Sequence, residues 1–180
     1  MADGSSPPQP PLAPAQIACV IASAIQYEVP ANALLAVAEQ ERGRPGQRLG
    51  NDNGTVDIGP MQFNSAYLRQ LERFGIQADH VDSWDCYPYL LAAWRIKNHL
   101  VHDRGPFWTR VANYHSRTPH HNQRYAASVA AKARQWGEWI ERHYPTRTMD
   151  ANAAAQVPSA RPSSQPPALA PSKPPTQGSP

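Results

Sequence analysis

The chain has 180 residues, a formal net charge of +3 and 20 prolines. Thirteen of these prolines lie in segments 1–14 and 151–180, which carry few large apolar side chains. Such segments cannot offset the entropy lost on ordering, so we predict a disordered N-terminal segment, 1–14, and a disordered tail, 146–180. The residues between them, 15–145, suffice for one hydrophobic core. The longest apolar run, 17–25, is far shorter than the roughly 20 residues that cross a bilayer, which excludes a membrane-spanning chain.

The basic residues are spread along the chain rather than clustered, so we expect no binding to nucleic acid. We also expect a monomer. No Lys or Arg precedes Arg42, and a secretory signal begins with a basic segment, so no conventional export signal is expected and the export route stays open. Cys19 and Cys86 are too far apart for a redox or zinc motif. Their spacing leaves two buried thiols and one disulfide equally open.

Helical spacing of apolar residues dominates the middle of the chain and predicts a mostly α domain. The first helix contains 17–25 and ends before Pro30, and the second follows Pro30 and stops at Gly43. Residues 44–63 are rich in glycine and predict a loop, with a hairpin at its Asn-Gly pair, residues 53–54.

Four further helices are predicted after this loop. Ser65 is the expected N-cap of a short helix that Gly75 closes. The other three are expected over 84–103, 108–114 and 122–143, and the last of them carries apolar residues at steps of three or four. The predicted domain is therefore helical, with one irregular polar segment between its second and third helices.

Glu41 is the candidate general acid. It falls in the last turn of the second predicted helix, beside Val37 and Ala38. Loss of solvation and the negative end of the helix dipole both raise the pKa of a carboxyl group in that position. A raised pKa is what a general acid needs near neutral pH. The alternative interpretation is a solvated Glu at a helix end.

The segment 59–65, GPMQFNS, offers two neutral amides, Gln62 and Asn64, beside the apolar Met61. This mixture suits an uncharged ligand rich in hydroxyl or amide groups, and a turn followed by an N-cap is the alternative. No metal or cofactor is expected, because the histidines near position 120 lack a zinc-binding pattern and the chain has no glycine-rich phosphate loop.

Three segments together resemble the lytic transglycosylases of the soluble-lytic-transglycosylase type. Residues 34–43, LLAVAEQERG, resemble the LLxAIAxxESG segment of that family. Residues 57–65, DIGPMQFNS, resemble the DIGLMQINS of its small members that accompany secretion, conjugation and pilus systems. Residues 113–125, NYHSRTPHHNQRY, resemble the YHSxTPxxNxxY of conjugation-associated members. The likeness keeps the family's motif order and spans about residues 16–130.

The resemblance implies a lysozyme-like α+β fold, in which a helical lobe and a loop-rich region flank a groove for glycan strands. It implies that Glu41 is the catalytic acid and base. The implied reaction cleaves the β-1,4 bond between MurNAc and GlcNAc in peptidoglycan and forms 1,6-anhydroMurNAc. The implied substrate-binding residues are Met61, Gln62, Asn64, Tyr114 and Tyr125.

The resemblance also implies a disulfide, a cell compartment and a protein partner. Small secretion-associated members carry cysteines at the places of Cys19 and Cys86, which implies a disulfide and an oxidising compartment, here the periplasm. The family further implies a partner in a secretion, conjugation or pilus apparatus, which the proline-rich tail would contact.

Three departures from the family pattern concern the site. Arg42 replaces the usual Ser after the catalytic Glu, and a guanidinium turned inward would lower the pKa of Glu41. Consecutive helical residues point about 100° apart, so we expect Arg42 to face solvent. Pro60 replaces Leu and stiffens the loop. His115 and Ser116 replace the commoner Asn-Ala pair, which concerns the positioning of the substrate.

Two other functions stay open. Asp57 follows Glu41 by 16 residues, in a segment that is also similar to the active-site segment of c-type lysozymes. Asp57 would then be the second carboxylate of a muramidase that hydrolyses the same bond. The alternative from another class is a non-catalytic assembly factor that only binds peptidoglycan, and the presence of Glu41 argues against it.

Overall fold

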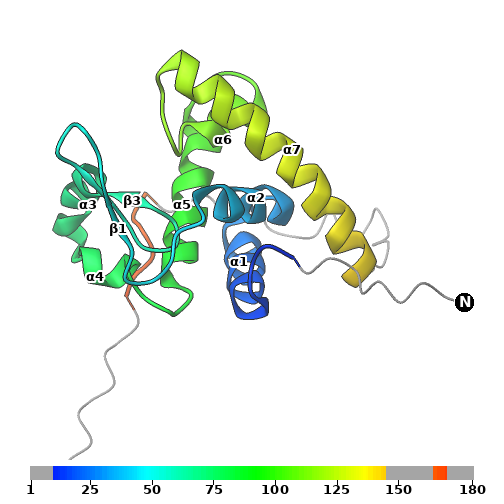
Figure 1. Ribbon diagram of the computed structural model, residues 1–180, viewed down its shortest axis with the longest axis horizontal. Coiled ribbons are helices and arrows are strands. Elements are labelled where there is room, and N and C mark those ends of the chain that lie inside the picture. Colours follow the sequence, from blue (N-terminus) through cyan, green and yellow to red (C-terminus); the bar gives the residue numbers. More distant parts are fainter. Residues whose placement is uncertain (1–9, 145–163, 170–180) are drawn as a thin grey trace, which may run out of the picture.

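The computed structural model describes residues 10–144 and 164–169 of the chain. Helices form most of this part, as predicted, and they join three short strands in one domain. The strands, α3 and α4 lie on one side of α5, and α1, α2 and α7 lie on the other (Figure 1). In chain order the elements are α1 (Pro14–Tyr27), α2 (Ala31–Glu41), β1 (Arg48–Gly50), β2 (Val56–Ile58), β3 (Phe63–Asn64), α3 (Ser65–Leu71), the 3-10 helix η1 (Glu72–Phe74), α4 (Ala78–Val81), α5 (Tyr87–His102), α6 (Phe107–Ala112) and α7 (Pro119–His143). None of the described helices combines the length and the apolar character that a membrane span requires.

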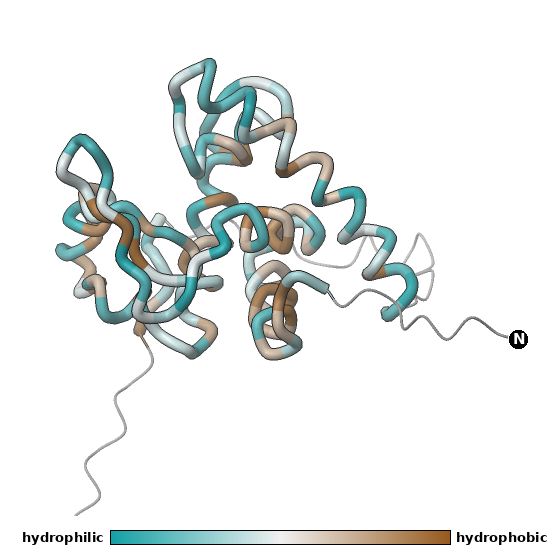
Figure 2. The backbone as a smooth tube through the Cα atoms, viewed as in Figure 1, coloured by the Kyte–Doolittle hydropathy of each residue, from teal (hydrophilic) through white to brown (hydrophobic). Residues whose placement is uncertain are grey.

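The helix α2 is the centre of the helical part. Six consecutive residues, from Ala33 to Ala38, are buried, because α1 packs against one side of the helix and α7 packs along another. A helix that is apolar on all sides is typical of such a central position. Figure 2 shows hydrophobic colour in α1, in α2 and in the sheet segment, whereas the tip of the hairpin is hydrophilic. Each buried Leu of α2 contributes about 1.5–3 kcal/mol by its removal from water.

The segment predicted as a loop forms a small antiparallel sheet in the order β1-β2-β3. Asp57 of β2 pairs with Leu49 on one side and with Asn64 on the other. The turn between β1 and β2 contains the predicted Asn-Gly pair, and Gly54 adopts a φ of +77° that favours glycine. The hairpin was therefore predictable, whereas β3 has only two residues and is too short to show an alternating pattern.

The cap of α3 differs from the prediction by one residue. Asn64 is the N-cap, and its side-chain oxygen accepts a hydrogen bond of 3.0 Å from the backbone N–H of Ala66. Ser65 is the first residue of the helix instead, and its hydroxyl oxygen accepts a bond from the backbone N–H of Val56 at 3.0 Å. Both residue types cap helices well, and the pairing of Asn64 in the sheet decides which of them takes the position.

Gly43 is required by packing rather than by its backbone angles. A Cβ atom at this position would lie 2.1 Å from the carbonyl oxygen of Gly59 and 2.9 Å from that of Pro60. The turn at 59–62 therefore lies directly against the end of α2. Gly59 is itself confined, because a Cβ atom there would lie 2.2 Å from the carbonyl oxygen of Val81. The contacts at Gly43 and Gly59 therefore fix the position of the sheet between the end of α2 and the end of α4.

The disulfide between Cys19 and Cys86 is present, which confirms the pairing that the family resemblance implied. It joins α1 to the residue before α5 across 67 residues of sequence. By the loss of chain entropy in the unfolded state, a closed loop of this length stabilises the fold by about 4 kcal/mol.

Parts of the two predicted tails lie on the domain. Leu12 is buried in the core, and Pro14 begins α1. In the C-terminal tail Pro167 is buried, and its carbonyl oxygen accepts a hydrogen bond of 2.9 Å from the hydroxyl group of Tyr87. Burial raises the pKa of Tyr87 to about 12, so this hydroxyl group remains a donor. The predicted disorder of residues 1–9, 146–163 and 170–180 lies outside the described residues.

The contact of the tail is expected to contribute to stability. Tyr87→Phe removes the donor of the bond to Pro167 and keeps the ring, so it should lower the free energy of unfolding of the full chain by about 1 kcal/mol. In a chain that ends at Asp150 the same substitution should have no such effect. Urea unfolding of the four proteins measures the difference. An equal effect of Tyr87→Phe in both backgrounds would contradict the contribution of the tail.

Candidate active site

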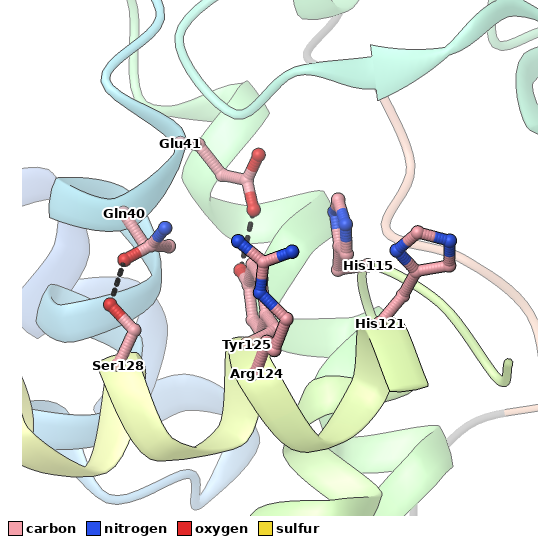
Figure 3. Close-up of a pocket in the computed structure, with 7 residues that line it drawn as sticks. All are labelled: Gln40, Glu41, His115, His121, Arg124, Tyr125 and Ser128. Carbon is pink, nitrogen blue, oxygen red and sulfur yellow. Dashed lines mark hydrogen bonds between the residues drawn. The ribbon is translucent and has the colours of Figure 1, made fainter. Parts of the chain in front are cut away.

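A cleft lies where the sheet, the end of α2 and the start of α7 meet. It consists of two adjoining hollows of about 470 and 580 Å³, which share Glu41, His115 and His121. The first hollow extends between α2 and α7, past Gln40 and Ser128 (Figure 3). The second extends over the hairpin. The cleft therefore continues on both sides of Glu41, as a chain-like ligand requires.

Glu41 is the last residue of α2 and has the perturbed acidity expected of it. Burial raises the pKa of its carboxyl group from an ordinary value of 4.5 to about 7, and the negative charge of Asp57 acts in the same direction. A hydrogen bond from Tyr125 and the positive charge of Arg95 oppose this rise. Burial has the largest effect, so Glu41 is near half protonation at neutral pH.

The bond from Tyr125 engages one of the two oxygens of the Glu41 carboxyl group. The Tyr125 hydroxyl group donates to Oε1 of Glu41 at 2.5 Å (Figure 3). Burial raises the pKa of Tyr125 well above its ordinary value, so the hydroxyl group keeps the proton that it donates to Oε1. Oε2 of Glu41 has no hydrogen-bond partner within residues 10–144 and 164–169, so it can carry the proton of the neutral carboxyl group. This oxygen is available to a ligand in the cleft.

The neighbours of Glu41 on the helix point elsewhere. Arg42 is exposed and takes a left-handed conformation with a φ of 51° at the end of α2, which confirms that it faces solvent. Glu39 accepts a hydrogen bond of 2.8 Å from the indole N–H of Trp136, and its carboxylate lies 3.8 Å from Nζ of Lys132. Glu39 therefore joins α2 to α7 and does not line the cleft.

Asp57 is the second carboxylate of the cleft, and both of its oxygens are engaged. Oδ1 accepts a hydrogen bond from the amide of Asn64 at 2.9 Å, and Oδ2 accepts one from the amide of Asn51 at 3.0 Å. The same amide group of Asn64 also donates to the hydroxyl group of Thr55 at 2.9 Å. These bonds fix Asp57 on the floor of the hollow over the hairpin.

Four of the five predicted substrate-binding residues line the cleft: Gln62, Asn64, Tyr114 and Tyr125. The side chain of Met61 does not, because it is fully buried in the core. Its carbonyl oxygen accepts a hydrogen bond of 2.8 Å from the buried hydroxyl group of Tyr114. Met61 therefore holds Tyr114 in place, and the sequence pattern could not separate this role from contact with a ligand.

His115, which departs from the family pattern, covers Tyr125. The two rings stack with centroids 4.7 Å apart and planes 3° apart. Burial lowers the pKa of His115, so the imidazole is neutral at neutral pH. The buried amide of Asn122 holds this segment in place, since it donates to the carbonyl oxygens of Thr109 and Ser116 at 3.0 Å.

Arg95 is one of the residues of the cleft that the motifs did not reveal. Its guanidinium carbon lies 4.0 Å from the ring centroid of Tyr67 and 4.6 Å from that of Tyr114. The available signal in the sequence was a basic residue four positions after Leu91, on the apolar side of a predicted helix. No group of three or more His, Cys, Asp or Glu that could hold a metal ion occurs in the described part of the chain.

Comparison with known proteins finds two kinds of relative. The chain is 30% identical to Protein IpgF of Shigella flexneri over 94 residues, which are 52% of this chain and 61% of that protein. It is 27% identical to the invasion protein IagB of Salmonella typhimurium over 101 residues, 56% of this chain and 62% of that protein. The chain thus spans about three fifths of the length of the curated relatives it matches. No family model matches it.

Glu41 is expected to make stability depend on pH. Between pH 4.5 and 7 the unfolded chain has released the proton that folded Glu41 keeps, so stability from this group falls as the pH rises, by up to about 3 kcal/mol. Glu41→Gln should lack this loss, and Glu39→Gln should retain it. Urea unfolding at pH 4.5 and pH 8 measures the effect. The same pH dependence in Glu41→Gln as in the parent would refute the raised pKa.

Proposed function

We propose that the protein is a lytic transglycosylase that cleaves the β-1,4 bond between MurNAc and GlcNAc in peptidoglycan. The observation that carries this proposal is the state of Glu41, whose pKa is about 7 and which lines both hollows of the cleft. Such a carboxyl group can give a proton at neutral pH and take one back. The amides and hydroxyl groups that line the cleft suit an uncharged sugar.

The proposed reaction uses one carboxyl group twice. Protonated Glu41 donates from Oε2 to the glycosidic oxygen, the bond from that oxygen to C1 of MurNAc breaks, and GlcNAc leaves. Positive charge develops at C1, where the carbonyl oxygen of the N-acetyl group of MurNAc can assist. The carboxylate of Glu41 then removes the proton of the C6 hydroxyl group while O6 bonds to C1. The product is 1,6-anhydroMurNAc, and Glu41 is protonated again.

Tyr125 supports both steps through one hydrogen bond. Its bond to Oε1 orients the carboxyl group and stabilises the anion that forms after the first proton transfer. The stacked ring of His115 restricts the motion of Tyr125. Tyr114 is fixed by the carbonyl oxygen of Met61 and forms part of the wall on the hairpin side.

A muramidase that hydrolyses the same bond is the second candidate function. The observation in its favour is that Asp57 lines the same hollow as Glu41. In that mechanism Asp57 would attack C1 or activate a water molecule. A non-catalytic factor that only binds peptidoglycan gains no such support, because binding alone does not require a carboxyl group with a pKa near 7.

The biological setting belongs to the same proposal. The disulfide between Cys19 and Cys86 suits an oxidising compartment, and we place the protein in the periplasm. Similarity to a protein named for invasion supports a role in opening the cell wall locally for a secretion, conjugation or pilus apparatus. Peptidoglycan strands are then the substrate, and a component of that apparatus is the partner, in contact with the proline-rich tail.

Glu41→Gln should abolish cleavage of purified sacculi, with a loss of at least about 10³-fold, because an amide neither donates nor accepts the transferred proton. Glu39→Gln is the matched control, since it removes a carboxylate of the same helix that holds α7. It should cleave at a rate close to that of the parent. Release of muropeptides measures both, with circular dichroism to verify the fold. An active Glu41→Gln protein would exclude Glu41 as the acid.

The released ends distinguish the two enzymatic candidates. A transglycosylase forms anhydro ends that contain no oxygen from the solvent, so digestion in ¹⁸O-labelled water should give unlabelled products by mass spectrometry. Asp57→Asn should then slow the reaction only modestly, since it disturbs the bonds to Asn51 and Asn64. Labelled reducing ends, together with a severe loss in Asp57→Asn, would establish the hydrolase instead.

A further inference from the structure

A second pocket adjoins the cleft. It has a volume of about 530 Å³ and lies between α5 and the segment that joins α6 to α7. It shares Arg95, His115 and Ser116 with the hollow that contains Glu41 and Asp57. A ligand bound beside Glu41 can therefore extend a substituent into this pocket.

Arg95 lies where the second pocket meets the cleft, and its guanidinium group is positioned to bind an anion there. The rings of Tyr67 and Tyr114 fix its guanidinium group, at 4.0 and 4.6 Å from their centroids. Contacts of this kind leave the N–H groups at the edge of the guanidinium plane free for hydrogen bonds. Within residues 10–144 and 164–169 the structure gives this guanidinium neither a hydrogen bond nor an ion pair.

The pocket's own carboxylate does not neutralise Arg95. Asp103 accepts hydrogen bonds from Arg117 at 2.9 Å and from Asn113 at 2.8 Å, and its carboxylate lies 2.7 Å from Nδ1 of His99. On the side of the cleft Arg95 lines the same hollow as Glu41 and Asp57, and its positive charge lowers the pKa of Glu41. Glu41 is protonated when it acts as the acid. Within residues 10–144 and 164–169 Arg95 forms no ion pair with any of these three carboxylates, so its N–H groups are available to a ligand.

The chemistry of the proposed substrate identifies the anion. The sugar rings of peptidoglycan are uncharged, and its acidic groups are the carboxylates of the short peptides that MurNAc carries on its lactyl group. We propose that the second pocket binds a carboxylate of this peptide and that Arg95 is its anchor. This inference rests on the proposed function. Binding of this carboxylate makes the protein selective for glycan strands that still carry peptides.

The test compares two substrates of equal glycan length, strands that carry peptides and strands from which an amidase has removed them. The parent should prefer the strands with peptides, and Arg95→Gln should reduce this preference by about tenfold or more, since a hydrogen bond between charged groups is lost. The ratio of the two rates is the readout, because any effect of Arg95 on the acidity of Glu41 acts on both substrates. Arg95→Lys keeps the charge without the planar fork and should give an intermediate ratio.

Arg73→Gln is the matched control, because Arg73 also lies over a ring, that of Phe74 at 4.7 Å, but lines none of these hollows. It should leave the ratio unchanged. A parent that cleaves neither substrate would refute the proposed function itself. A parent that cleaves, but whose ratio is the same as that of Arg95→Gln, would overturn the peptide pocket and leave the proposed function standing.

A binding measurement on the unaltered full chain covers the case in which Arg95→Gln does not fold. Titration of ¹⁵N-labelled protein with the tripeptide L-Ala-γ-D-Glu-diaminopimelate should shift the Nε–H resonance of Arg95. The same tripeptide with all carboxylates amidated should not. Equal responses to the two peptides, or none to either, would overturn the inference.

Discussion

The close contact between the end of α2 and the 59–62 turn decides where the cleft lies. Position 43 has no room for a side chain, because the carbonyl oxygens of Gly59 and Pro60 occupy that space. Any larger residue would push the sheet away from α2, and with it Asp57, Gln62 and the hairpin wall. Glu41 lies only two residues before this contact. The same packing that joins the two parts of the domain therefore places the acid at their junction and removes it from water.

The acidity of Glu41 is a balance of opposing effects rather than the result of burial alone. Burial raises its pKa, and the bond from Tyr125 together with the charge of Arg95 lowers it. Without the two opposing effects the carboxyl group would be too weak an acid, and its anion too unstable, to exchange a proton in both directions at neutral pH. Arg95 thus lowers the pKa of Glu41 and also lines the second pocket, and the rings of Tyr67 and Tyr114 fix its position between the two.

The sequence predicted those parts that depend on local patterns. Apolar spacing gave the helices, the Asn-Gly pair gave the hairpin, and the position of Glu41 at a helix end gave its raised pKa. It did not predict the short α4, the placement of Met61 in the core or the role of Arg95, because each depends on contacts between distant segments. Gly43 shows the limit well. The sequence predicts Gly43 as the residue that ends the helix, but Arg42 takes the left-handed conformation there. Gly43 is needed because the 59–62 turn, 16 or more residues later, packs directly against it.

The two carboxylates of the cleft differ in what their oxygens can do. Glu41 has one oxygen held by Tyr125 and one without a partner among the described residues, so it can transfer a proton while its orientation is kept. Asp57 has both oxygens bonded to amides, and Asn64 in turn caps α3 and bonds Thr55. An attack of Asp57 on C1 would compete with these bonds and disturb the start of α3. A mechanism that needs only one carboxyl group with a free oxygen therefore fits this cleft better than one that needs two.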